Sequence, residues 1–146
     1  MKVHEDFKDF IEALNKNDVE YVIVGAFALA FHGHPRATGD IDIWLRPTPQ
    51  NARAVLKALH DFGFGELHIS EDDIVSGKII QLGYPPVRID LITLMEGVTH
   101  EEIWKGRVSG TFGDQQVSYI GRDEFIRNKK AIGRHKDLAD LDLLGE

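Results

Sequence analysis

The 146-residue sequence contains no cysteine. Disulfide frameworks and thiolate zinc sites are therefore excluded, and oxygen or histidine ligands must hold any metal ion, which favours magnesium or manganese. Long apolar segments are also missing. The longest apolar run, residues 21–31, is too short to span a bilayer, which takes about 20 residues. We expect a soluble, cytoplasmic protein with no membrane association.

Basic residues are in the minority, because 17 Lys and Arg face 24 Asp and Glu and the net charge is -7. This balance argues against a broad nucleic-acid-binding surface. One stretch without acids nevertheless carries five cations, which are Arg127, Lys129, Lys130, Arg134 and Lys136. A single small site can therefore be strongly positive.

Hydrophobic patterns predict alternating helices and strands along the chain. Helices are expected at residues 5–16, 26–31, 49–62, 99–104, 123–132 and 136–144, with a short helical turn near 70–73. Strands are expected at residues 21–24, 38–45, 78–82, 87–93, 107–112 and 115–120, the last two as a hairpin. This order indicates an α/β (α+β) fold with a mixed central sheet and helices packed against it. Residues 1–146 are expected to form a single domain.

Two acids stand two positions apart in the predicted strand 38–45. Side chains alternate in a strand, so Asp40 and Asp42 project from one face while Ile41 and Ile43 pack on the other. Neighbouring carboxylates repel, and a divalent metal ion between them relieves this repulsion. The alternative is structural, with Asp40 capping a turn and Asp42 paired with an arginine in the preceding loop.

A third acid, Asp90, lies in the apolar run 87–93. If that run forms a strand beside residues 38–45, Arg88 and Asp90 face the same side as Asp42. Three carboxylates form the oxygen ligand set that Mg²⁺ or Mn²⁺ prefers. The segment His32-Gly33-His34 could offer a second metal pair, which this oxygen set makes unnecessary.

The pair Gly25-Ala26 follows the predicted strand 21–24 and opens a helix. A turn without a Cβ lets the backbone N–H groups at a helix start approach an anion such as a triphosphate. The alternative is a glycine that only ends a strand.

Together these residues resemble the signature of the nucleotidyltransferase superfamily with a polymerase-beta-like core. The resemblance rests on Val24-Gly25-Ala26-Phe27-Ala28, on residues 34–43 (HPRATGDIDI) and on residues 88–92 (RIDLI). The closing segment 128–140 is similar to small bacterial members, including nucleotidyltransferase-like toxins of toxin-antitoxin pairs. The fold implied is a nucleotidyltransferase-like core.

The resemblance implies that Asp40, Asp42 and Asp90 are catalytic and bind divalent ions, Mg²⁺ or Mn²⁺. It also implies that the turn at Gly25 and Ala26 holds the β and γ phosphates of a nucleoside triphosphate such as ATP. The chain departs from the family at one point: members usually show Gly-Gly or Gly-Ser where this sequence has Gly-Ala, so a hydroxyl contact to phosphate is missing.

Further candidates for nucleotide binding are cationic or polar side chains near these motifs. Arg36 and Thr38 precede the acids and could reach phosphate or hold Asp42 in place, and Arg88 could flank Asp90 in the same way. Toward the carboxyl terminus, the cations that could face a triphosphate are Lys129, Arg134 and Lys136. Structural ion pairs are the alternative, including an i,i+4 pair of Lys136 with Asp140.

The leading hypothesis is a metal-dependent transferase that moves a nucleoside monophosphate from a nucleoside triphosphate to an acceptor and releases pyrophosphate. The acceptor, whether small molecule, RNA or protein, is not visible in the sequence. A catalytically silent nucleotide-binding or interaction module is the second hypothesis, and a metal-dependent phosphohydrolase is the third. The small size favours an open site that a homodimer or a partner protein completes.

Overall fold

The computed structural model describes residues 4–35, 39–65, 67–84 and 87–146. Its helices are α1 (Glu5–Lys16), α2 (Gly25–Phe31), α3 (Pro49–Leu59), α4 (Glu71–Val75), α5 (His100–Gly106), α6 (Arg122–Ile132) and α7 (His135–Leu143), with a π-helical extension of α3 at His60–Phe64. Its strands are β1 (Tyr21–Val24), β2 (Asp40–Leu45), β3 (Ile80–Tyr84), β4 (Val87–Ile92), β5 (Val108–Phe112) and β6 (Gln115–Tyr119).

The six strands form one mixed sheet in the order β3-β4-β2-β1-β6-β5. The β2–β4 and β1–β6 pairs are parallel, and the other neighbours are antiparallel. The predicted fold class, a mixed central sheet with helices packed against it, is therefore confirmed.

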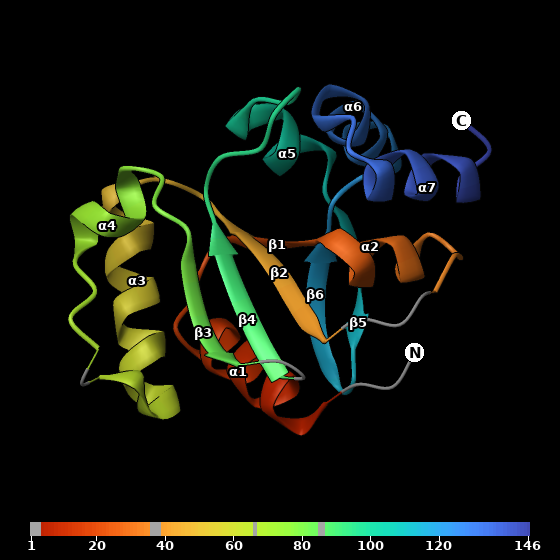
Figure 1. Cartoon of the computed structure of the whole chain (residues 1–146). Helices are drawn as coiled ribbons and strands as arrows, with labels where there is room; N and C mark the ends of the chain where they lie inside the picture. The colour runs from red at the N-terminus through yellow and green to blue at the C-terminus, as the bar shows by residue number, and fades with distance from the viewer. Residues whose placement is uncertain (1–3, 36–38, 66, 85–86) are drawn as a thin grey trace.

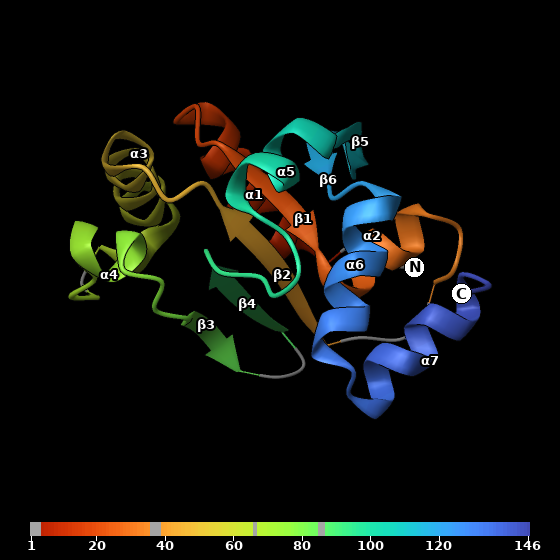
Figure 2. The ribbon, with the colours of Figure 1, turned by 90° about the horizontal axis from the view of Figure 1, so that it is seen from above.

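The helices fall into two groups around the sheet. Helices α1 and α3 contact each other, and α4 lies beside α3 (Figures 1 and 2). Helices α6 and α7 also contact each other and lie on the side of the molecule that carries α2 (Figure 2). The core between these layers includes the fully buried side chains of Phe10, Ile23, Ile41, Ile43 and Phe125.

Local sequence signals explain several helix starts. Thr48 caps α3 by accepting a hydrogen bond from the Asn51 backbone N–H, and Pro49 occupies the first turn. Capping boxes begin α4 at Ser70 and α5 at Thr99.

Some predicted boundaries shift. Helix α2 begins at Gly25 rather than at residue 26, and the helical backbone that follows α3 is interrupted at Gly63, whose φ of 104° is not helical. Strand β3 begins at residue 80, two positions later than predicted, because Gly77 adopts a φ of 89° and Lys78 pairs with Asp73 instead of joining the sheet. Residue 38, the predicted start of β2, lies outside the described residues.

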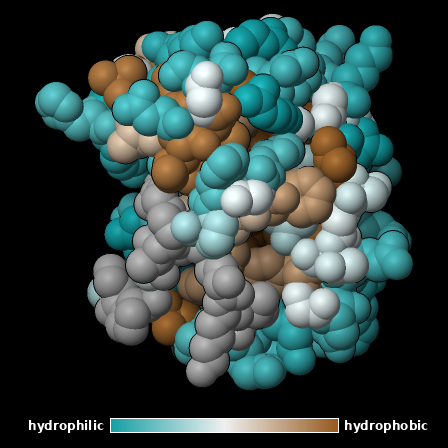
Figure 3. All heavy atoms as spheres, turned by 90° about the vertical axis from the view of Figure 1, so that its right-hand side faces the viewer, coloured by the Kyte–Doolittle hydropathy of each residue, from teal (hydrophilic) through white to brown (hydrophobic). Residues whose placement is uncertain are grey.

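Within the described residues, no helix has the length and apolar character needed to cross a membrane. The face that carries α2, β5 and α7 is largely hydrophilic, with hydrophobic surface in separate patches (Figure 3).

Candidate active site

Three carboxylates meet on one face of the sheet, where β2 and β4 run in parallel. Asp42 stands directly beside Asp90 in this register, and Asp40 stands beside Arg88. One oxygen of each of Asp40, Asp42 and Asp90 can be chosen so that all three oxygens lie within 4.8 Å of one another. Ile41 and Ile43 project to the opposite face and are fully buried. The strand pairing thus concentrates negative charge at one point.

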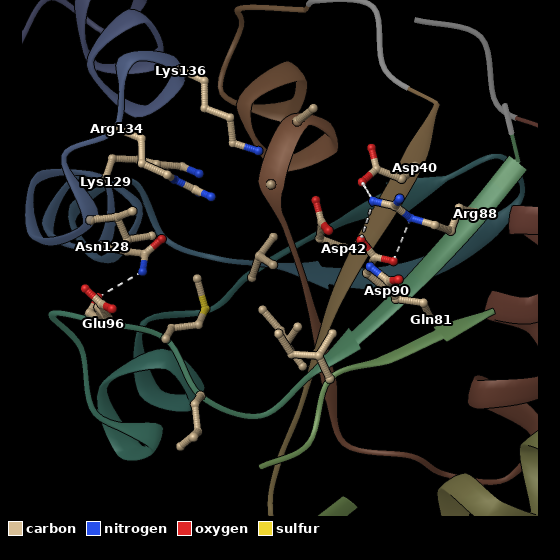
Figure 4. A pocket seen from close by; sticks show the side chains of 18 residues that line it. Asp40, Asp42, Gln81, Arg88, Asp90, Glu96, Asn128, Lys129, Arg134 and Lys136 are labelled. Atoms are coloured by element: carbon tan, nitrogen blue, oxygen red, sulfur yellow. Dashed lines mark hydrogen bonds and ion pairs between the residues drawn. The ribbon is translucent and has the colours of Figure 1, made fainter. Parts of the chain in front are cut away.

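Arg88 lies between two of these acids. Its Nε donates to Asp90 Oδ1 at 2.9 Å, and its Nη2 donates to Asp90 Oδ2 and to Asp40 Oδ2 at 3.0 Å each (Figure 4). Arg88 and Asp90 are two residues apart on one strand and therefore share a face. The guanidinium partly neutralises the acidic cluster.

Gly25 allows Asp42 to occupy its position. Val24 pairs with Asp42 across β1 and β2, so the chain turns into α2 directly beside the Asp42 carboxylate. A Cβ at residue 25 would lie 2.2 Å from Asp42 Oδ2, and the backbone there has a φ of 67°. Only glycine satisfies both conditions without strain.

The Asp42 carboxyl group is strongly perturbed. Burial and repulsion from Asp40 and Asp90 raise its pKa to about 7, and the nearby Lys129 ammonium offsets only part of this effect. Without a metal ion, Asp42 therefore retains a proton over much of the range below neutral pH.

These acids line a pocket of about 500 Å³ between the sheet and the α6–α7 turn. Gly25 and Ala26 line the same pocket, as do three cations that reach toward it from the opposite side (Figure 4). The sequence-predicted residues that the pocket brings together are Gly25, Ala26, Asp40, Asp42, Asp90, Lys129, Arg134 and Lys136. Arg36 and Thr38 lie outside the described residues.

Two of the three cations are held by buried acids. The Lys129 ammonium is 3.4 Å from Asp137 Oδ1 and 4.0 Å from Asp140 Oδ2, and Arg134 Nε donates to Asp137 Oδ2 at 2.7 Å. Asp137 is fully buried, which disfavours its charge, yet Arg134 and Lys129 hold its pKa below the usual value. Sequence reasoning missed Asp137, because the contact between α6 and α7 is tertiary.

Other pocket residues were not predicted either. Gln81 stands beside Asp90 across β3 and β4, and Asn128, which is 3% exposed, donates from its amide to the Glu96 carbonyl at 2.9 Å. Only the strand order places Gln81 here, and no local motif signals it.

The donor set fits a divalent cation. Three carboxylates supply hard oxygen ligands, and a cation would replace the proton that Asp42 otherwise retains. Among the described residues, no other group of acidic or histidine side chains has this geometry. The ring of His32 instead lies with Nε2 2.8 Å from the Ile120 carbonyl oxygen, an interaction that suits a structural role.

Gly25→Ala should weaken Mn²⁺ binding because the new methyl group displaces the Asp42 carboxylate. Gly33→Ala is the matched control, since Gly33 also has a positive φ, of 98°, but a Cβ there meets nothing within 4 Å. Both variants should lose stability, by about 1 to 2 kcal/mol for the backbone alone. Calorimetric Mn²⁺ titration should separate them, and equal affinities would contradict the assigned role of Gly25.

The raised pKa of Asp42 predicts a pH-dependent stability in chelator. The folded protein binds more protons than the unfolded chain between pH 4 and 7, so this contribution is complete below pH 4 and is lost as pH rises through about 7. Relative to Asp42→Asn, wild-type protein should lose unfolding free energy over this interval in urea titrations. A constant difference between the two proteins would refute the prediction.

Comparison with known proteins supports the fold. No family model and no curated protein sequence matches the chain. Four chains of solved structures do match, among them the two that follow. A protein from Thermotoga maritima described as a candidate nucleotidyltransferase aligns with a TM-score of 0.63 and 14% identity over 93% of this chain and 88% of its own.

The second structure is the lincosamide antibiotic adenylyltransferase LnuA with lincomycin bound. It aligns with a TM-score of 0.59 and 13% identity over 100% of this chain and 99% of its own. At this level of identity the likeness concerns the fold. The chain therefore has a nucleotidyltransferase-like fold, as the sequence resemblance predicts.

Proposed function

We propose that this chain transfers a nucleoside monophosphate from a nucleoside triphosphate to an acceptor, with divalent cations bound by Asp40, Asp42 and Asp90. The observation that carries the proposal is one pocket with an acidic and a basic side. The three carboxylates lie on the sheet, and Lys129, Arg134 and Lys136 lie across from them. This division suits a substrate whose phosphates are bound by metal and by cationic side chains.

The chain's own groups have distinct tasks in this reaction. Lys129 and Arg134 attract the triphosphate, and Asp137 keeps both in place. Gly25 and Ala26 let the phosphates approach the backbone at the start of α2. Bound divalent cations supply charge stabilisation for the entering and departing oxygens.

The bond changes are those of an in-line displacement. An acceptor oxygen forms a bond to the α phosphorus, the bond from that phosphorus to the α–β bridging oxygen breaks, and pyrophosphate leaves. An acceptor hydroxyl gives its proton to water. The Asp90 carboxylate, on the β4 side of the pocket, would help to hold a divalent cation there.

The nucleotide donor, the acceptor and the protein partner are proposed as chemical classes. LnuA is an adenylyltransferase, and we therefore include ATP among the donors, with Mg²⁺ or Mn²⁺ as the ion. The acceptor is a small molecule, RNA or protein. A homodimer or a partner protein that completes the open site is a further proposal, and the resemblance of the closing segment suggests a partner of the antitoxin type.

A catalytically silent nucleotide-binding module is the alternative function. Ala26 favours it, because an alanine offers no hydroxyl to the phosphates. The two functions differ in turnover: the transferase releases pyrophosphate when an acceptor is present, whereas the module binds nucleotide without releasing it.

Incubation with cell extract and α-³²P-labelled nucleoside triphosphates tests the transferase. Wild-type protein with Mg²⁺ should label an acceptor and release unlabelled pyrophosphate. Asp42→Asn and Asp90→Asn should each reduce labelling at least about a hundredfold, since each removes a charge that acts on the transition state.

Asp114→Asn is the matched control, because Asp114 is exposed in the β5–β6 turn and should leave labelling unchanged. Labelling that persists in the Asp42 variant would contradict the mechanism. Saturable binding of nucleotide without pyrophosphate release would support the silent module instead.

A further inference from the structure

Arg88 occupies a bridging position in the acidic cluster. Its Nη2 lies 3.0 Å from both Asp40 Oδ2 and Asp90 Oδ2, and therefore spans the two strands. Its Nε bond of 2.9 Å to Asp90 Oδ1 stays within β4. The side chain is 29% exposed and lines the pocket.

A divalent ion and this guanidinium compete for the same oxygens. Magnesium binds carboxylate oxygens at about 2.0 to 2.1 Å. An ion bridging Asp40 Oδ2 and Asp90 Oδ2 would take the place of Nη2, whereas the Nε contact to Asp90 Oδ1 uses the other oxygen. A cation would therefore break the hydrogen bonds of Arg88 Nη2 and leave the hydrogen bond of Nε in place.

We propose that Arg88 is a built-in counter-ion that holds Asp40 and Asp90 together before metal arrives and opens its Nη2 arm when the metal binds. The Nε arm stays on Asp90 and keeps that carboxylate oriented. This inference rests on the proposed function for the presence of the ion, but not on the identity of the acceptor. It makes Arg88 a positioning residue with a measurable effect on metal affinity.

Removal of the Arg88 guanidinium should raise the affinity for a divalent cation and lower the stability of the metal-free protein. Removing the guanidinium removes a positive charge next to the ion, so the affinity for a divalent cation rises. It also leaves Asp40 and Asp90 without their shared partner, so the protein without metal becomes less stable. An ion pair away from the metal ligands would show the second effect without the first.

Calorimetric titration of Mn²⁺ into Arg88→Met, without nucleotide, tests the proposal. We expect at least about tenfold tighter binding than in wild type, a lower melting temperature in chelator and a larger upward shift on adding Mn²⁺. Arg88→Lys keeps the charge and should bind within about twofold of wild type. Arg88→Gln removes the charge but keeps an N–H donor, and it replaces the methionine variant if that protein does not fold.

Arg46→Met is the matched control. Arg46 follows β2, and its Nη1 lies 2.9 Å from Glu20 Oε2, so this ion pair does not involve the acidic cluster. The variant should leave Mn²⁺ affinity unchanged. Unchanged or weaker binding in Arg88→Met and Arg88→Gln would overturn the proposal, as would equal tightening in Arg88→Lys or Arg46→Met. Absence of Mn²⁺ binding in wild type and all variants would instead contradict the metal site of the proposed function, and the inference with it.

Discussion

Repulsion among three carboxylates is the constraint on which the site depends. The parallel pairing of β2 with β4 sets Asp42 beside Asp90, and alternation along β2 adds Asp40 on the same face. The protein balances this charge with a proton on Asp42 and with the guanidinium of Arg88. In the proposed function, a substrate that arrives with divalent cations would displace that proton and the Nη2 contacts of Arg88, which ties the chemistry of the site to its electrostatics.

The backbone at Gly25 and a second group of charged side chains, on α6 and α7, complete the acidic site. Gly25 leaves room for the Asp42 carboxylate where any Cβ would collide with it. Across the pocket, Asp137 lies buried at the α6–α7 contact and holds Lys129 and Arg134. This buried acid sets the positions of the two cations that face the carboxylates across the pocket. The pocket thus holds Lys129 and Arg134 across from the acids of β2 and β4, and the proposed function puts a phosphate chain between the two sides.

The sequence predicted what local rules control. Period-2 alternation placed Asp40 and Asp42 on one face, and the Ser70 and Thr99 capping boxes marked helix starts. Tertiary features could not be predicted from the sequence, because they depend on packing between distant segments. They include the strand that lies beside β2, the hydrogen-bond partners of Arg88 and the contact of Lys129 with Asp140 between two helices. The resemblance to a known family implied that Asp90 acts together with Asp40 and Asp42, which spacing alone left open.

The most direct test of the account is a crystal structure of the protein with Mn²⁺ and a non-hydrolysable nucleoside triphosphate, with the ions located by anomalous scattering. The account predicts a manganese peak about 2 Å from carboxylate oxygens of Asp42 and of at least one of Asp40 and Asp90. It also predicts phosphates between that ion and the cations of α6 and α7. Manganese bound elsewhere, with the acids still paired to Arg88, would contradict it.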